Sequence, residues 1–332
     1  MKNKSLWGIV FLFLLSISFP VSSDGGDIKA TIKEWEVPTP NSRPHDPAVD
    51  PDGLLWYTGQ QVNVLGRLDP KTGKIDEYLL KVPDSGPHGL VADKEGNIWF
   101  TANYKGYIGK LIPSTGVVIE YSLPSPAKDP HSLVFDHKGV IWFTAERGNS
   151  VGRLDPQSRE LRVKPLSTPD SKPYGIALNS KGIPFFCEFG INKLGIINPE
   201  TMEIREKVLP PGTRPRRLAI DPNDRVYYTD FSRGYLGWFD PDTGGLQEWP
   251  SPGGPQSNPY GIAITADGAV WYSESGLKPN TIVRFDPPSQ KFQSWPIPSG
   301  GGTVRNMVST PDGSLYIACS GVNKVGIVKV ER

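Results

Sequence analysis

The chain has 332 residues, enough for one to three domains, and its 36 Lys and Arg nearly balance its 35 Asp and Glu, for a formal net charge of +1. This balance excludes the clustered basic excess typical of nucleic-acid-binding proteins, so we expect no nucleic-acid partner. The 36 glycines and 34 prolines are spread along the chain rather than gathered in one linker, which favours many short strands joined by turns over disorder.

Residues 1–23 have the pattern of a secretory signal peptide. Lys2 and Lys4 precede an apolar run that ends near Phe19, and small residues then lead to a cleavage point before Asp24. The alternative is an uncleaved anchor, but the apolar run is short for a membrane span of roughly 20 residues. We therefore expect an exported protein, periplasmic or secreted, with no stable membrane insertion after cleavage.

The rest of the chain repeats one unit seven times. Each copy opens with a short apolar run, passes through a polar turn and returns in an aromatic run. The copies are PHDPAVDPDGLLWYT (44–58), PHGLVADKEGNIWFT (87–101), PHSLVFDHKGVIWFT (130–144), PYGIALNSKGIPFFC (173–187), PRRLAIDPNDRVYYT (215–229), PYGIAITADGAVWYS (259–273) and VRNMVSTPDGSLYIA (304–318). The second residue of the copies recurs every 42 to 45 residues. A period in the forties built from strands is typical of β-propeller blades.

Each unit contains four strand signals. An IGRL-like run and a run resembling KIDEYLL follow the opening hairpin, and Pro-containing turns separate them. The seventh unit lacks its fourth run, and the sequence ATIKEWEVP at 30–38 resembles the missing copy. We therefore predict an all-β fold, a single seven-bladed β-propeller domain over residues 24–332. Its N-terminal strand would close the ring and remove two exposed sheet edges.

The two cysteines fall in equivalent strands of different units. Cys187 lies in the fourth unit and Cys319 in the seventh. Three blades apart, their Cα atoms would lie far beyond the ~7 Å limit for a disulfide. We expect both thiols to be free and buried.

Polar residues converge at one end of the predicted channel. The first strand of each blade lines a propeller's channel. Its second residue, here called the opening residue, and the end of the second strand therefore lie at the same face of the propeller. The opening residues are His45, His88, His131, Tyr174, Arg216, Tyr260 and Arg305, and second-strand ends add Glu146, Glu188, Asp230 and Glu274. His137 falls in a turn at the other face. Imidazoles and carboxylates at a channel mouth suit a metal site or general acid–base chemistry, and a hydrated polar rim is the alternative.

The third unit carries a motif that resembles a known family, the streptogramin B lyases, also called virginiamycin B lyases. In that family a His opens one blade, Glu-Pro-His opens the next, and Trp-Phe-x-x-Glu ends that blade's second strand. Here His88 opens the second unit, Asp129-Pro130-His131 opens the third, and Glu146 ends its WFTAE run. Two features depart from the family: Asp129 is one methylene shorter than Glu, and the motif lies in the second and third units rather than the last two blades.

The resemblance, which covers essentially all seven units, implies a Mg²⁺-dependent lyase that opens a cyclic depsipeptide at its ester by C–O elimination. Asp129 and Glu146 would hold Mg²⁺, because a hard cation prefers carboxylate oxygens. His131 would act as the base, and His88 would orient the substrate or the leaving group. The partner would then be a small-molecule or cyclic peptide ester, and we expect a monomer.

Two other functions stay open from the sequence. The chain could be an extracytoplasmic propeller that binds a ligand or a protein without chemistry, since fold does not imply function. It could also hydrolyse a lactone, as related metal propellers do. Those enzymes usually bind calcium through Glu, Asn and Asp, whereas the ring here is richer in His and Arg.

Overall fold

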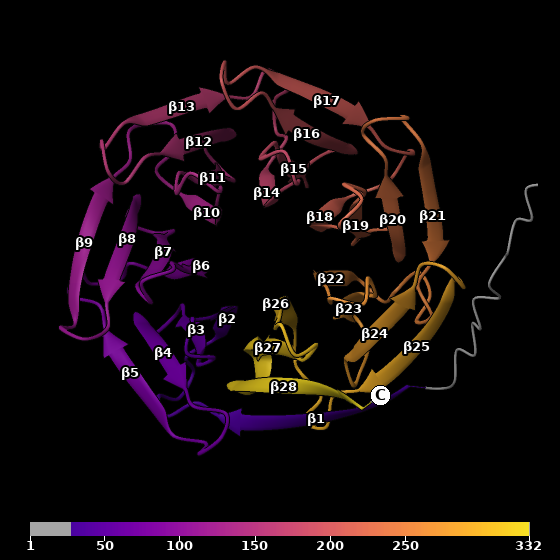
Figure 1. Cartoon of the computed structure of the whole chain (residues 1–332), viewed down its shortest axis with the longest axis horizontal. Coiled ribbons are helices and arrows are strands. Elements are labelled where there is room, and N and C mark those ends of the chain that lie inside the picture. Colours follow the sequence, from indigo (N-terminus) through magenta and orange to yellow (C-terminus); the bar gives the residue numbers. More distant parts are fainter. Residues whose placement is uncertain (1–27, 332) are drawn as a thin grey trace, which may run out of the picture.

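The computed structural model describes residues 28–331 as seven four-stranded antiparallel sheets around a central channel (Figure 1). This arrangement confirms the predicted seven-bladed β-propeller. The predicted signal peptide, residues 1–23, lies outside the described residues. No helix within residues 28–331 has the length and apolar character needed to cross a bilayer.

Six blades are consecutive in the chain, and their strands run from the channel outward in sequence order. Blade 1 contains β2 (Pro44–Val49), β3 (Leu55–Gly59), β4 (Val64–Leu68) and β5 (Ile75–Leu79). Blade 2 contains β6 (Pro87–Ala92), β7 (Ile98–Ala102), β8 (Tyr107–Ile112) and β9 (Val117–Ser122). Blade 3 contains β10 (Pro130–Phe135), β11 (Ile141–Ala145), β12 (Ser150–Leu154) and β13 (Leu161–Pro165).

The next three blades repeat this order. Blade 4 contains β14 (Pro173–Leu178), β15 (Pro184–Glu188), β16 (Lys193–Ile197) and β17 (Ile204–Val208). Blade 5 contains β18 (Pro215–Ile220), β19 (Val226–Asp230), β20 (Tyr235–Phe239) and β21 (Leu246–Pro250). Blade 6 contains β22 (Pro259–Ile264), β23 (Val270–Glu274), β24 (Thr281–Asp286) and β25 (Lys291–Pro296).

Blade 7 joins the two ends of the chain. It contains β26 (Val304–Ser309), β27 (Leu315–Cys319), β28 (Lys324–Glu331) and, outermost, β1 (Lys29–Glu36), as Figure 1 shows. β1 pairs with β28 along its whole length, from Lys29 opposite Glu331 to Glu36 opposite Lys324. The predicted closure of the ring by the N-terminal strand is confirmed.

The apolar core lies between neighbouring blades. The second strand of every blade is buried along its whole length. The glycine of the IGRL-like third strand makes room for an aromatic ring of the second strand, since a Cβ on Gly66 would lie 1.9 Å from the Tyr57 ring. Cys187 and Cys319 are buried and free, as predicted.

The first strand of each blade has an irregular register that shapes the channel. In blade 3, Pro130 pairs with Ala145, but the next pair is Leu133 with Phe143. The same shift occurs in all seven blades. Such an irregularity releases the residues between the pairs from the regular alternation of side chains. Two consecutive residues of each first strand, the opening residue and the one after it, therefore line the channel.

Candidate functional site

The predicted ring of opening residues lies at the end of the channel where the first strands begin, here called the mouth. Four of its rings form a continuous series, in which the centroid distances from His45 to His88, from His88 to His131 and from His131 to Tyr174 are each 3.8 Å. The Tyr174 hydroxyl contacts the Tyr260 hydroxyl in a short hydrogen bond. The structure thus brings the three predicted histidines together.

Hydrogen bonds fix the tautomers of two of these imidazoles. His45 Nδ1 lies 2.8 Å from an Asp46 carboxylate oxygen, and His88 Nδ1 lies 3.1 Å from the backbone carbonyl of His131. Both partners only accept, so Nδ1 carries the hydrogen in each ring and Nε2 is a bare acceptor. His131 Nδ1 lies 3.0 Å from the Ser132 hydroxyl, which can donate or accept.

Burial keeps the three histidines neutral. It is the largest cause that holds the pKa of His45 well below its usual range, and the charges of Arg305 and Arg217 add to it. Burial also holds the pKa values of His88 and His131 well below the usual range. At neutral pH each ring therefore has an unprotonated nitrogen, which is the form that can accept a proton.

A polar layer spans the channel behind the histidines. An Arg217 Nη lies 2.8 and 3.1 Å from the two Asp46 carboxylate oxygens, and its other Nη donates to Ser132 Oγ at 3.1 Å. Asn306 also donates to Asp46, at 3.0 Å. A Cβ on Gly175 would lie 2.9 Å from Arg217 Cα, so glycine makes room for this crossing. On the far side of the layer lies a small cavity of about 190 Å³.

Sequence reasoning missed this layer, although the repeat contains a signal for it. The residue after the opening residue is glycine in three copies, Gly89, Gly175 and Gly261, and a polar residue in the other four, Asp46, Ser132, Arg217 and Asn306. The position is glycine in three copies, so polar residues there in the other four copies indicate a second layer of channel residues behind the opening residues.

The predicted motif residues of blade 3 lie beside one another. His131 Nε2 is 3.9 Å from a Glu146 carboxylate oxygen, and the Glu146 side chain is 29% exposed. Burial, followed by the charge of Asp129, raises the pKa of Glu146 above its usual value. Asp129 is buried, and its carboxylate accepts the backbone N–H groups of Arg147 and Gly148 at the start of the loop after β11.

Glu146 lies one residue later in its blade than the other predicted acids. Ala145 pairs with Pro130, whereas in the next three blades the equivalent partners are the acids themselves, Glu188, Asp230 and Glu274. Successive strand residues point to opposite sides, so these three side chains turn into the loops of their own blades. Asp230, for example, accepts the backbone N–H of Arg214 at 2.9 Å. The expectation that all four acids share the mouth is therefore corrected for these three.

A second group at the mouth has the residue types of a metal site. Within residues 28–331, His45, Asp46 and His88 are the group of at least three potential metal ligands whose donor atoms all lie within 4.8 Å of one another. Its single carboxylate, however, already binds the Arg217 guanidinium. The charge of Arg305 also acts on His45. Guanidinium groups this close disfavour a cation at these three residues.

Arg216 lies in an aromatic enclosure on the other side of the mouth. Its guanidinium carbon is 3.8 Å from the Tyr260 ring centroid, 4.2 Å from that of Phe231 and 4.7 Å from that of Phe189. Phe189 and Phe231 follow β15 and β19 directly, at the positions that correspond to Glu146 in blade 3. Cation–π contacts hold this arginine in place, and no carboxylate among the described residues forms an ion pair with it.

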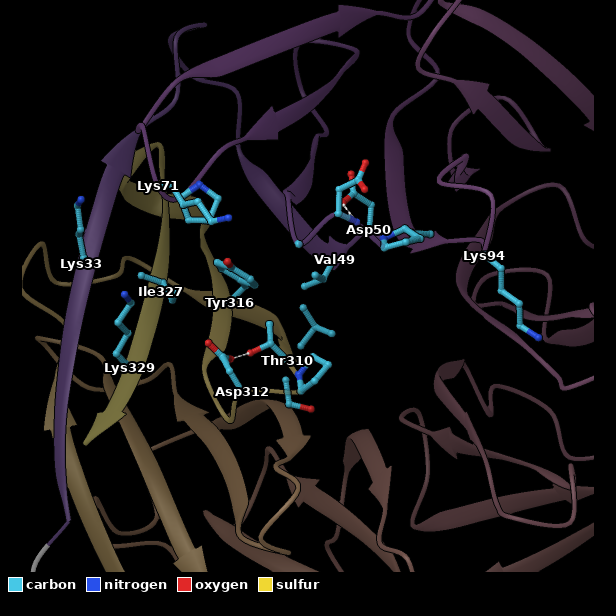
Figure 2. Close-up of a pocket in the computed structure, with 18 of the residues that line it drawn as sticks. Lys33, Val49, Asp50, Lys71, Lys94, Thr310, Asp312, Tyr316, Ile327 and Lys329 are labelled. Carbon is cyan, nitrogen blue, oxygen red and sulfur yellow. Dashed lines mark hydrogen bonds between the residues drawn. The ribbon is translucent and has the colours of Figure 1, made fainter. Parts of the chain in front are cut away.

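The opposite end of the channel has different chemistry. Figure 2 shows the hollow there, of about 1010 Å³, between the turns of blades 1, 2 and 7. Lysines surround it, namely Lys33, Lys71, Lys94 and Lys329. Asp312 at its edge accepts a hydrogen bond from the Thr310 hydroxyl, and no histidine lines it. Among the described residues that line this hollow there is thus no imidazole like those of the mouth.

Comparison with known proteins connects the chain with a family. The profile of the virginiamycin B lyase family matches residues 26–250. A search of curated proteins finds no match.

Solved structures similar to this chain include a streptogramin B lyase, with 26% identity and a TM-score of 0.83, covering 91% of this chain and 98% of that one. Virginiamycin B lyase from Staphylococcus aureus has 26% identity and a TM-score of 0.82, with 91% and 99% covered. A catalytically inactive histidine-to-alanine variant of that enzyme, solved with quinupristin, has 25% identity and a TM-score of 0.81, with the same coverage.

Proposed function

Because the chain belongs to the virginiamycin B lyase family, we propose that it is a carbon–oxygen lyase that opens a cyclic depsipeptide or similar ester by elimination. One observation carries the proposal: a neutral imidazole, His131, lies 3.9 Å from the partly exposed carboxylate of Glu146 at the mouth of the channel. Removal of a proton from carbon requires a positioned base, and a neighbouring carboxylate stabilises the imidazolium that then forms.

In the proposed reaction, His131 Nε2 removes the hydrogen from the carbon next to a carbonyl group. The electron pair of that C–H bond forms a carbon–carbon double bond, and the C–O bond at the neighbouring carbon breaks. The ester oxygen leaves as part of a carboxylate, so no water is consumed. This role requires the tautomer in which His131 Nδ1–H donates to Ser132 Oγ, 3.0 Å away.

The neighbours of His131 have distinct roles in this proposal. The Glu146 carboxylate would stabilise the imidazolium that forms when His131 takes the proton. His88 has a bare Nε2, because its Nδ1–H donates to a backbone carbonyl. It would accept a hydrogen bond from a substrate N–H and so orient the ester. The Ser132 hydroxyl, which also binds Arg217, would hold the His131 ring in place.

The carboxylates of blade 3 have the donor chemistry of a Mg²⁺ site. The Glu146 side chain accepts no hydrogen bond from residues 28–331, and the charge of Asp129 contributes to its raised pKa. Asp129 also forms an ion pair with Arg147, whose Nε lies 3.4 Å away, but the Arg147 side chain is 69% exposed and can turn into solvent, unlike the buried Arg217 beside Asp46. A cation between Asp129 and Glu146 would relieve their repulsion, and hard cations prefer carboxylate oxygens. We propose that Asp129 and Glu146 hold the ion. When bound, Mg²⁺ would polarise the carbonyl group next to that C–H bond and so acidify its hydrogen.

The mass of the product tests the proposed reaction. Purified protein is incubated with quinupristin and Mg²⁺, and the product is analysed by mass spectrometry. Elimination gives a linear product with the mass of the substrate, whereas hydrolysis adds one water. If neither product forms at any Mg²⁺ concentration, streptogramin lyase activity is rejected. A product that is one water heavier would favour hydrolysis.

A non-catalytic binding propeller is the second candidate function, because Arg216 at the mouth has no carboxylate partner among the described residues. An anionic ligand would satisfy it without any reaction. For either function we propose an exported, monomeric protein. Cell fractionation and the N-terminal sequence of the mature chain test the predicted cleavage before Asp24.

A further inference from the structure

We infer that the mouth also contains an oxyanion site, formed by Arg43 and Arg305, that binds a carboxylate group of the substrate or the product. Which molecule carries the carboxylate, the substrate or the product, rests on the proposed function. The binding of an oxyanion does not, because it follows from the contacts and charges of the two arginines and can be measured without turnover.

The site is a small pocket over the seam between blades 7 and 1. It has a volume of about 290 Å³, which suits a small group rather than a whole cyclic peptide. The lining includes Asn41, Arg43, Gln61, Thr303, Arg305 and Asn323. It contains two guanidinium groups, side-chain amides and a hydroxyl, but no Asp or Glu. The lining is therefore rich in donors and has no carboxylate of its own.

Neither arginine is neutralised within the protein. The side chains of Arg43 and Arg305 form no ion pair with any described carboxylate, and Arg305 Nε is buried without a hydrogen-bond partner. Arg217, in the layer behind them, shows the contrast, because Asp46 neutralises it at 2.8 Å. A partly buried charge without a partner is costly, so the pocket favours an anion from solution. The planar guanidinium fork matches the two oxygens of a carboxylate.

The pocket lies next to the groups proposed to react. Arg305 opens blade 7 and so neighbours His45 in the ring of opening residues. After burial, the charge of Arg305 is the largest influence on His45, and Arg43 also contributes. His45 contacts His88, which contacts His131. An oxyanion between the two arginines would therefore lie at one end of the imidazole series that contains the proposed base.

The chemistry of C–O elimination gives this site a use. When the C–O bond of an ester breaks, the leaving group is a carboxylate and no proton is needed to release it. Cations near the mouth would stabilise that charge as it forms. A carboxylate that the substrate already carries would bind the same donors, and this would select acidic esters. The carboxylate of the product and a carboxylate on the substrate would bind the same donors, and titration with intact and linear quinupristin distinguishes them.

Anion titrations test the site directly. Inorganic phosphate and acetate are titrated into the intact protein at fixed ionic strength, with sodium chloride as the reference. We expect phosphate and acetate to bind and chloride not to reproduce the signal. Arg305→Gln and Arg43→Gln should each weaken binding about tenfold, the loss expected for one charge-assisted contact. Lys71→Gln and Lys329→Gln, at the opposite end of the channel, should leave it unchanged.

Three results would overturn the inference: no phosphate or acetate binding, an equal effect of chloride, or equal loss in the lysine variants. Thermal melts establish that each variant is folded. Arg305→Lys provides a second test if Arg305→Gln unfolds, because it keeps the charge and loses the fork. The affinity of Arg305→Lys for phosphate should lie between that of the wild type and the roughly tenfold weaker affinity expected for a variant that lacks one guanidinium charge. Affinity unchanged in every folded arginine variant would also reject the site.

A second titration identifies the source of the carboxylate. Intact quinupristin is compared with its linear acid, prepared by chemical elimination. Tighter binding of the acid, lost in Arg305→Gln, would assign the product's carboxylate. Binding of acetate and phosphate but not of the acid would assign a carboxylate on the natural substrate. Anion binding without ring opening supports the site and rejects the proposed lyase; ring opening without anion binding does the reverse.

Discussion

The two ends of the channel are built by the same seven first strands, yet they use their polar residues differently. At the lysine-rich end, acids in the hairpin turns are occupied: Asp50, Asp93 and Asp136 accept the indole N–H groups of Trp56, Trp99 and Trp142 at 2.8, 2.9 and 3.1 Å. At the mouth, Glu146 accepts no hydrogen bond from the described residues, and two imidazoles have bare Nε2 atoms. The presence of acids does not distinguish the ends, and acids at the mouth such as Asp46 and Asp129 are occupied as well. The buried imidazoles with bare Nε2 atoms are what the mouth adds.

Deletion of residues 24–40 should have the largest effect, because it removes β1 and so affects both ends of the channel at once. The fourth strand of blade 7 carries Lys33 near the far hollow and leads into the loop that contains Arg43 at the mouth. Without it, β28 becomes an exposed edge. We expect the cooperative thermal transition to move to a clearly lower temperature or to disappear. A truncated protein that melts cooperatively at the wild-type temperature would show that closure is dispensable.

His131→Ala should abolish ring opening while the protein stays folded. A positioned base contributes about 10² to 10⁴ in rate. His137→Ala is the matched control, because His137 is exposed in a turn at the opposite end. Rates are compared by the disappearance of quinupristin under identical conditions. Equal losses in both variants, or no loss in His131→Ala, would remove His131 from the mechanism.

Glu146→Gln should reduce activity by about tenfold or more at low Mg²⁺, and added Mg²⁺ should restore part of it. The substitution removes a ligand charge but not the proposed proton acceptor. Asp52→Asn, at an exposed acid of the far end, serves as the control and should leave the Mg²⁺ dependence unchanged. A Glu146→Gln protein whose activity is independent of Mg²⁺ would argue against the metal site and would leave electrostatic support of His131 as the role of Glu146.

Acidification should lower the stability of the folded protein through the three histidines of the mouth. The folded-state pKa values of His45, His88 and His131 lie well below the usual 6.5 of an unfolded chain. As the pH falls below about 6.5, the unfolded state binds protons that the folded state does not, so stability is lost. The slope is at most about 1.4 kcal/mol per pH unit for each histidine. Denaturant unfolding at pH 7.5 and 5.5 measures this slope, and His88→Gln should flatten it.

Asp129→Glu should have the smallest effect, and it is the substitution that restores the family's Glu-Pro-His pattern. We expect activity to be preserved or raised, since the longer acid can still serve as a ligand. Asp129 also accepts two backbone N–H groups, at Arg147 and Gly148, so a melting curve must accompany the assay. A large loss of activity in a fully stable Asp129→Glu protein would mean that the loop contact, not metal binding, is the reason for the aspartate.

The sequence was sufficient for the number of blades, for the closing strand and for the ring of histidines, because each depends only on the spacing of the repeat. The Asp46–Arg217 pair was not predictable in this way, since it requires the register shift that turns a second residue per blade into the channel. The separation of Glu146 from Glu188 was also missed, although the spacing of the repeat contains it: Glu146 lies 16 residues after Pro130, whereas Glu188 lies 15 residues after Pro173. Arg43 has the repeat position that Asp129 has in the third unit, directly before the proline, and its meeting with Arg305 was not predicted.

The seam of blade 7 has a consequence for the order of assembly. Arg43 and Arg305 come from opposite ends of the chain and meet in one pocket once the N-terminal strand has paired with β28. Contacts between such distant segments have a high cost of loop closure and tend to form late in folding. The oxyanion pocket is therefore the part of the mouth expected to mature last. An anion that binds only the closed ring shifts the equilibrium between the open and closed ring toward the closed one. The ligand would therefore stabilise the pairing of the two ends of the polypeptide.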